Sequence, residues 1–229
     1  MDISIITNTL NSVRVVAEPI IKEVAPKIQE TMKAVSEGML RLSESYPSLE
    51  SFAESLNKVS DIMGDVLKVL DIASDASAII GFKVQQSEKN MDEFDSVEAY
   101  IKYLNDEIKL DREKFDNLTE EEKVSYTVVG LAVETGAVSE KLGVKIPVEA
   151  VEMLTKLGNI SAEATKLVDF ISKLKDEGID DFKEVYECIN GEGDSDRVKT
   201  GNALVSVLDE LEEGEGNKVL NDIIDEIRE

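Results

Sequence analysis

Apolar residues recur every three or four positions along most of the chain, which is the period of a helix that buries one side. The first such series covers positions 6–42. Pro19 and Pro26 interrupt it, and an interior proline removes a backbone hydrogen bond and clashes with the preceding turn. We therefore expect a kink or a break near one of them, with a short helix first and a longer one starting near Pro19.

A second apolar series follows Pro47 and keeps steps of three and four without a miss over positions 49–73. Its mean spacing is close to that of a coiled coil, so it predicts a coiled-coil-like seam. Together the two series predict an N-terminal antiparallel helical hairpin over residues 1–84 that turns at 43–47. The seam is also a candidate hydrophobic interface between copies of the chain, with the members Leu49, Phe52, Leu56, Val59, Met63, Val66 and Leu70.

Residues 85–90 are polar and lack any apolar period, so we expect a linker there, followed by an acidic helical bundle over 91–229. Asp95 with Glu98, and Thr119 with Glu122, have the spacing that caps a helix N-terminus. The helix opened by Thr119 should run to about Lys141. Because it is apolar on nearly every face over 124–133, we expect it at the centre of the bundle.

Glycines follow the predicted helices in the last third of the chain. Short helices are predicted over 147–157, 161–177 and 181–190, each followed by a glycine that suits a left-handed cap: Gly158, Gly178 and Gly191. Two more are expected near 196–213 and 217–228. No segment alternates with the period of a strand, so the predicted fold class is all-α.

Missing residue types exclude most familiar catalytic sites. The chain has no His, so it contains no Ser-His or Cys-His pair and no histidine ligand for zinc. Its single cysteine, Cys188, is surrounded by acids that would raise a thiol pKa, which favours a structural role. We therefore predict a protein that is not an enzyme and requires no cofactor.

One segment resembles a calcium-binding loop, with oxygen-bearing side chains at alternate positions over 190–196. It has Ser195 where that loop needs a glycine and Gly201 where it needs a bidentate glutamate. A glycine-rich turn that ends in an Asp196 cap explains the segment better, and we predict no metal site.

Tyr100 and Tyr103 are three residues apart on the predicted helix after Asp95. Aromatic pairs in this position usually border a core, and the alternative is an exposed binding patch.

Two segments, 94–100 and 121–133, are similar to stretches in uncharacterised acidic helical proteins of bacteria and prophages. The similarity covers less than a fifth of the chain. It implies a bacterial or phage origin and carries over no functional residue.

Acidic residues outnumber basic ones by 49 to 25, which gives a net charge of −24. Such a balance opposes direct contact with nucleic acid or with an anionic bilayer. It favours a basic protein partner, in the manner of immunity proteins and nucleic-acid mimics. We expect a cytoplasmic protein without a membrane span, because the most apolar stretch is only half as long as a spanning helix.

Residues 146–229 hold 22 acidic and 9 basic residues, so the partner-binding patch is expected there. Asp180, Asp181 and Glu184 can be explained as residues that cap a helix N-terminus. The four acids near a predicted helix C-terminus cannot, because negative charge is unfavourable at that end. They are the predicted acidic patch, and their replacement by glutamine should stabilise the free protein slightly: Glu210, Glu212, Glu213 and Glu215.

The alternative is a structural or assembly protein. In that case the hairpin would mediate homo-oligomerisation through its apolar seam. An acidic inhibitor would not need the seam, whereas an assembly protein would lose its oligomeric state without it.

Overall fold

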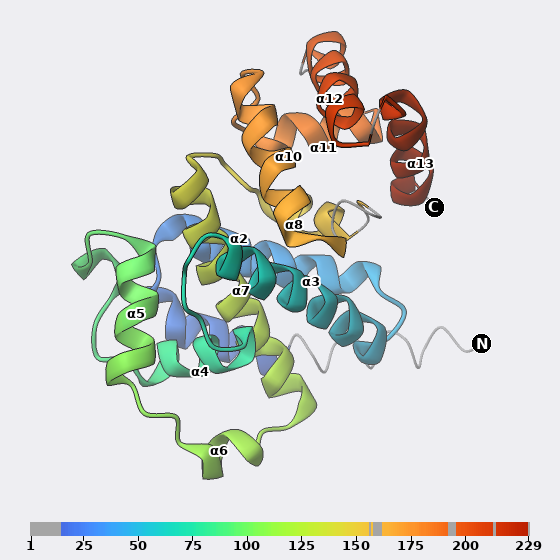
Figure 1. The fold of residues 1–229 in the computed structure, drawn as a ribbon. Coiled ribbons are helices and arrows are strands. Elements are labelled where there is room, and N and C mark those ends of the chain that lie inside the picture. The colour runs from blue at the N-terminus through green and yellow to red at the C-terminus, as the bar shows by residue number, and fades with distance from the viewer. Residues whose placement is uncertain (1–14, 156, 158–161, 192–195, 213, 229) are drawn as a thin grey trace. The chain divides into compact units, whose positions relative to one another are not determined.

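The computed structural model describes residues 15–155, 157, 162–191, 196–212 and 214–228 (Figure 1). The described chain is helical and contains no strand, so the predicted all-α class is confirmed. One isolated parallel bridge pairs Lys145 with Asp181. The chain divides into two compact units, Met1–Val138 and Ser139–Glu229, which are described separately below.

The first unit begins with a helical segment over 15–24, which the 3-10 turn η1 (Ala25–Lys27) follows. The longer helix does not start near Pro19 as expected, since the helical segment passes through it. The break falls at Pro26, which occupies one of the first two positions of η1. The backbone N–H at the start of a helical turn has no partner within that turn, so proline loses no hydrogen bond there. This explains why the chain begins a new turn at Pro26.

Two longer helices, α2 (Glu30–Leu42) and α3 (Leu49–Val69), are joined by the 3-10 turn η2 (Ser43–Ser45), which fits the predicted turn. Ser48 caps α3, because its hydroxyl accepts the backbone N–H of Ser51 at 3.2 Å. Leu49 and Leu70 are half-buried. The five seam residues between them are at most 5% exposed: Phe52, Leu56, Val59, Met63 and Val66.

The rest of the unit comprises α4 (Ser77–Gln86), η3 (Met91–Glu93), α5 (Val97–Glu107), α6 (Arg112–Asp116) and α7 (Glu120–Leu142). The predicted capping of α7 is confirmed: the Thr119 N–H donates to Glu122 at 2.8 Å, and the Glu122 N–H donates to the Thr119 hydroxyl at 3.2 Å. For α5 the capping residue is Ser96 and not Asp95, since the hydroxyl of Ser96 accepts the Ala99 N–H.

Helix α7 is buried as its apolar sides predicted, but its buried part belongs to the first unit and not to a separate bundle over 91–229. Every residue over 124–138 except Gly136 is buried. Its backbone touches that of α4, because a methyl group at Gly130 would overlap the Ser77 carbonyl and one at Gly81 would overlap the Tyr126 carbonyl. Glycine at both positions therefore lets the two helices approach more closely than side chains would permit.

Residues 85–90, expected as a linker between domains, lie within the first unit. Helix α4 extends to Gln86, and both Val84 and Ser87 are buried. The Ser87 hydroxyl donates to the Lys89 carbonyl at 2.8 Å and accepts the Lys89 N–H at 3.1 Å. Polar composition thus reflects hydrogen bonding within a packed turn, and the boundary between the units falls in the last turn of α7.

The second unit contains α8 (Val148–Thr155), α10 (Ala164–Asp176), α11 (Phe182–Asn190), α12 (Arg197–Leu211) and α13 (Gly216–Arg228). Helix α11 contacts α8, α12 and α13, and α12 also contacts α10. Gly178 and Gly191 have φ angles of +81° and +71°, so two of the predicted glycine caps are confirmed. Gly158 lies outside the described residues.

Candidate functional site

A carboxylate is enclosed in the core of the first unit. Glu134, on α7, is 1% exposed. Ser77 of α4 donates to its Oε2 at 2.5 Å, and Ser74, in the segment before α4, donates to its Oε1 at 3.2 Å. The Ser77 hydroxyl also lies 2.6 Å from that of Ser60 on α3. One carboxylate therefore connects three parts of the unit to its central helix.

Burial raises the pKa of Glu134 to about 7 from its usual 4.5, while the hydrogen bonds from Ser77 and Ser74 act in the opposite direction. Among the described residues no cation lies within ion-pair distance of this carboxylate. Because the side chain is enclosed, it cannot reach a substrate in this state. The Glu134 cluster, formed by Ser60, Ser74, Ser77 and Glu134, is therefore a structural feature with an ionisable centre.

Sequence reasoning did not single out Glu134, which looked like one of many acids. A usable signal was nevertheless present. The residue follows directly on the run of apolar positions at 124–133, within a helix predicted to be buried on all sides.

A second charged group is buried in the first unit. Lys83, on α4, is 4% exposed, and its ammonium group forms a 2.6 Å ion pair with Asp75, whose side chain is 44% exposed. Asp75 therefore compensates the buried lysine from the surface, so this pair anchors the segment between α3 and α4.

The predicted acidic patch in the second unit is not a set of free carboxylates. Glu210 pairs with Lys173, and Glu215 pairs with Lys218 at 2.9 Å. Glu212 pairs with Lys166 at 3.1 Å, with its side chain 19% exposed. Glu213 lies outside the described residues. Lysines of α10 and α13 therefore compensate the charge of the three described acids.

Acids without an ion-pair partner occur instead at the turn between α10 and α11. Asp176, Glu177 and Asp180 are exposed, and none of them forms an ion pair with a described residue. Asp181 caps α11 by accepting the Lys183 N–H at 3.0 Å, as its position predicted. We call Asp176, Glu177 and Asp180 the acidic turn.

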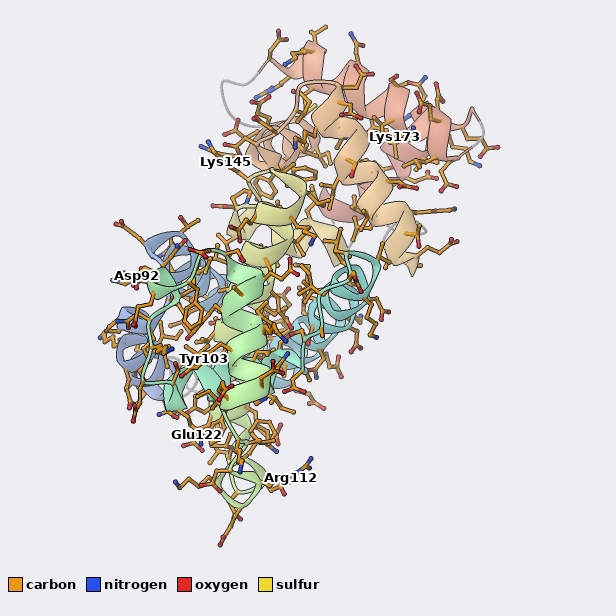
Figure 2. All side chains as sticks on the ribbon, turned by 60° about the vertical axis from the view of Figure 1, so that its left-hand side comes forward. Asp92, Tyr103, Arg112, Glu122, Lys145 and Lys173 are labelled. Carbon is orange, nitrogen blue, oxygen red and sulfur yellow. The ribbon has the colours of Figure 1, made fainter. Side chains whose placement is uncertain are left out.

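Three aromatic rings cluster where α5 begins. Phe94 lies 5.2 Å from Tyr100 and 5.0 Å from Tyr103, centroid to centroid. Tyr100 is fully buried, whereas Tyr103, also on α5 (Figure 2), is half-buried. The ammonium group of Lys89 lies 5.1 Å from the Tyr103 ring and 5.6 Å from the Phe94 ring. Of the two alternatives, Tyr100 belongs to the core, and Tyr103 borders it with part of its ring reachable.

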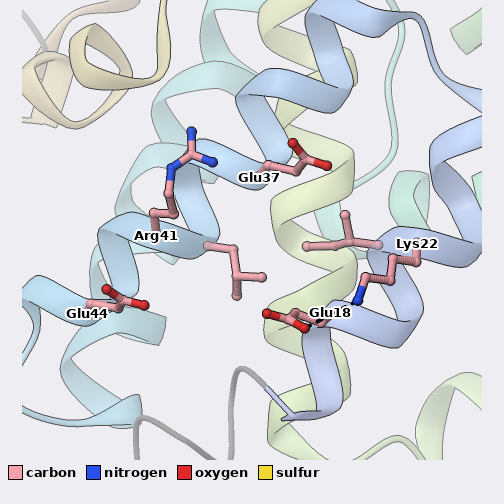
Figure 3. Close-up of a pocket in the computed structure, with 7 residues that line it drawn as sticks. Glu18, Lys22, Glu37, Arg41 and Glu44 are labelled. Carbon is pink, nitrogen blue, oxygen red and sulfur yellow. Dashed lines mark hydrogen bonds and ion pairs between the residues drawn. The ribbon is translucent and has the colours of Figure 1, made fainter.

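A small cavity of about 220 Å³ lies between the helical segment 15–24 and α2 (Figure 3). Its lining comprises Glu18, Ile21, Lys22, Glu37, Leu40, Arg41 and Glu44. Lys22 pairs with Glu18 at 3.4 Å. Both signs of charge meet over two aliphatic side chains, and the lining offers no Ser, Thr, Cys or Tyr as a nucleophile.

The described residues contain no group of three Asp, Glu or Cys side chains arranged to hold a metal ion. The loop that resembled a calcium site falls largely on residues 192–195, which lie outside the described part. Cys188 is half-buried, and its sulfur lies 3.7 Å from the Arg197 carbonyl oxygen, a contact between α11 and the start of α12.

Comparisons of the chain with protein families, with curated proteins and with solved structures give no match. Within the described part, no helix combines the length and apolar character that crossing a membrane requires.

Proposed function

We propose that the protein is a non-enzymatic binding protein that occupies a basic surface on another protein. One observation carries the proposal. Among the described residues Glu134 is the one buried carboxylate, so the other described acids are exposed or partly exposed at the surface. The surplus is shared by both units: residues 1–138 hold 26 acidic and 14 basic residues, and residues 139–229 hold 23 and 11.

A surface of this kind attracts a positive partner over a distance of about a Debye length and repels nucleic acid and anionic bilayers. Immunity proteins and nucleic-acid mimics neutralise basic proteins on this principle, and we place the protein in that class. The acidic turn is the contact we favour in the second unit. Its carboxylates are exposed and form no ion pair with a described residue, whereas Glu210, Glu212 and Glu215 already have lysine partners.

The alternative, assembly through the hairpin seam, receives no support from burial. Five of the seam residues are already covered within the chain, so an oligomer through them would require that face to open. The large apolar side chains that are exposed among the described residues are Val15, Val69 and Val198, which are scattered along the chain.

Affinity capture tests the proposal. The tagged full chain is used to capture partners from a bacterial lysate at low salt and at about 0.5 M NaCl, where charges beyond a few ångströms are screened. We expect a basic protein that is released at high salt and binds again when purified. An acidic partner, or one retained equally at both salt concentrations, would contradict charge-driven binding.

The contact in the second unit is tested with the purified partner. Neutralising the acidic turn (Asp176→Asn, Glu177→Gln, Asp180→Asn) should weaken binding and reduce its salt dependence. A matched variant removes the same charge from exposed acids of α3 (Glu50→Gln, Glu54→Gln, Asp61→Asn). Equal losses in the two variants would show that only net charge matters and that the acidic turn is no specific contact.

A further inference from the structure

An open groove of about 740 Å³ lies in the first unit between the end of α4 and α5. Gln86, Glu88 and Lys89 contribute to it from one side, and Tyr103, Asp106 and Glu107 from the other. Ile108 extends its apolar part. The groove is therefore lined by an aromatic ring, three carboxylates, an amide and the two lysines Lys89 and Lys102. It adjoins the aromatic cluster described above through Tyr103.

The face of the aromatic cluster already holds a cation. The Lys89 ammonium lies over both Tyr103 and Phe94, within the roughly 6 Å at which a ring attracts a positive charge. Lys89 itself is exposed, and it forms no ion pair with a described residue. The hydrogen bonds that fix its turn come from its backbone, so its side chain can leave the rings without breaking them.

Acceptors for a cation surround the rings. Glu88 and Glu107 are exposed and have no ion-pair partner among the described residues, whereas Asp106 pairs with Lys102 at 2.8 Å. The Oε1 atom of Gln86 is buried and receives no hydrogen bond. A buried acceptor without a donor is unfavourable, so a ligand that supplies an N–H group there would satisfy it.

We infer that this groove receives an arginine side chain of the basic partner, with Lys89 occupying the ring face in its absence. The inference rests on the proposed function and names the contact in the first unit. A guanidinium fits better than an ammonium because it is planar, stacks on an aromatic face and offers five N–H donors. It can stack on Tyr103 while it donates to Glu88 or Glu107, and it reaches Gln86 Oε1 if the Gln86 amide turns toward the groove.

The probe is the peptide acetyl-Arg-Arg-Arg-amide, titrated into the ¹⁵N-labelled full chain at low salt. We expect saturable amide shifts centred on residues 86–89 and 103–108. The matched triple-lysine peptide should bind less tightly. Equal affinity for the two peptides would overturn the preference for a guanidinium.

Lys89 gives the test in which the gain in affinity, compared with that of a matched lysine variant, separates the groove from nonspecific attraction. Lys89→Ala vacates the ring face and should tighten binding of the triarginine peptide roughly twofold to fivefold. Lys58→Ala removes the same charge from an exposed position on α3 and serves as the control. If both variants gain the same affinity for the triarginine peptide, Lys89 does not compete for the site and the inference is wrong.

Two more substitutions test the contacts. Tyr103→Leu should weaken binding of the triarginine peptide, while Tyr103→Phe, which keeps the ring, should not. Glu107→Gln should weaken it about threefold to fivefold, and Glu54→Gln, a matched exposed acid on α3, should change it little. Glu107 is at the surface, so its variant tests the groove even if the core-bordering Tyr103→Leu variant unfolds.

The outcomes separate this inference from the proposed function. If the peptide shifts only amide signals of the acidic turn, the groove is not the arginine site, but binding of a basic partner is not contradicted. The inference about the groove is also wrong if a basic partner is captured but the groove variants leave its affinity unchanged. If the peptide binds in the groove and the captured partner is acidic, the arginine site stands and the proposed function fails.

Discussion

At the scale of single residues, Glu134 couples stability to pH. Its pKa of about 7 in the folded chain lies above the usual 4.5, so between these values the folded state holds a proton that the unfolded state has released. The proton on Glu134 therefore stabilises the folded state fully below about pH 4.5, and this contribution to the free energy of unfolding is lost as the pH rises through about 7. Because the chain has no His, few other groups titrate in this range.

We predict that the free energy of unfolding falls by about 2 kcal/mol between about pH 5.5 and pH 8, and that Glu134→Gln removes this fall. Glutamine cannot ionise, and it resembles the protonated carboxyl in shape. Urea unfolding at several pH values measures the effect, with Glu177→Gln as the exposed control. Parallel curves for wild type and Glu134→Gln would show that Glu134 does not titrate in this range.

The lysine partners of the predicted acidic patch change the effect that we expect from replacing its glutamates by glutamine. Glu212→Gln breaks the contact with Lys166 in a half-buried setting, so we predict a small loss of stability and not the gain that a helix C-terminus alone would suggest. The urea midpoint of Glu212→Gln is compared with that of Glu177→Gln, which has no partner to lose. A higher midpoint for Glu212→Gln would mean that the helix dipole outweighs the pair.

At the scale of helices, the contact between α4 and α7 allows no side chain at Gly130. We predict that Gly130→Ala destabilises the chain by several kcal/mol, because the added methyl group meets the Ser77 backbone, which is fixed in the core. Gly64→Ala is the matched control. Gly64 lies inside α3 with open space around it, so alanine there should stabilise by about 0.5–1 kcal/mol.

Urea unfolding of the two glycine variants at one pH measures whether Gly130→Ala lowers the free energy of unfolding and Gly64→Ala raises it. If Gly130→Ala were as stable as wild type, the two helices would have room to separate, and the close approach would not be required for folding.

Much of each helix could be predicted because its causes are local. The Thr119 capping box, the glycines at 178 and 191 and the apolar sides of α7 are all visible within a few residues of sequence. The contacts that assemble the helices are not local. Ser77 meets Glu134 across 57 positions, and Lys166 meets Glu212 across 46. No periodicity encodes such pairs, so the Glu134 cluster and the lysine partners emerged only from the structure.

Local patterns alone do not decide between neighbouring candidates. Asp95 and Ser96 both suit a capping position, and Pro19 and Pro26 both suit a break. The direction in which the chain enters a helix decides such choices, and packing sets that direction. The segment 85–90, predicted as a linker, lies within the first unit, since polar residues that hydrogen-bond one another within a turn can lie inside a compact unit.

At the scale of the whole molecule, the acidic surplus repels itself. Residues 1–138 and 139–229 each have a net charge of −12. We predict that NaCl, raised from about 10 mM to about 0.5 M, increases the Tm by a few degrees, equivalent to roughly 1 kcal/mol. Calorimetry in NaCl measures this without the general stabilisation that sulfate would add. A Tm that falls with salt would mean that the lysine–glutamate pairs dominate over the repulsion.

The central place of α7 bears on how the chain folds while it is being synthesised. Helices α3 and α4 emerge first, but Gly130 and Glu134 of α7, the helix that α4 packs against, follow more than 40 residues after the end of α4. At roughly 5–20 residues per second, the growing chain waits several seconds for α7. During that interval Phe82 of α4 lacks the Tyr126 ring of α7, which packs 5.2 Å from it in the folded chain. The nascent chain is therefore most exposed to aggregation and to chaperones just before residue 138 appears.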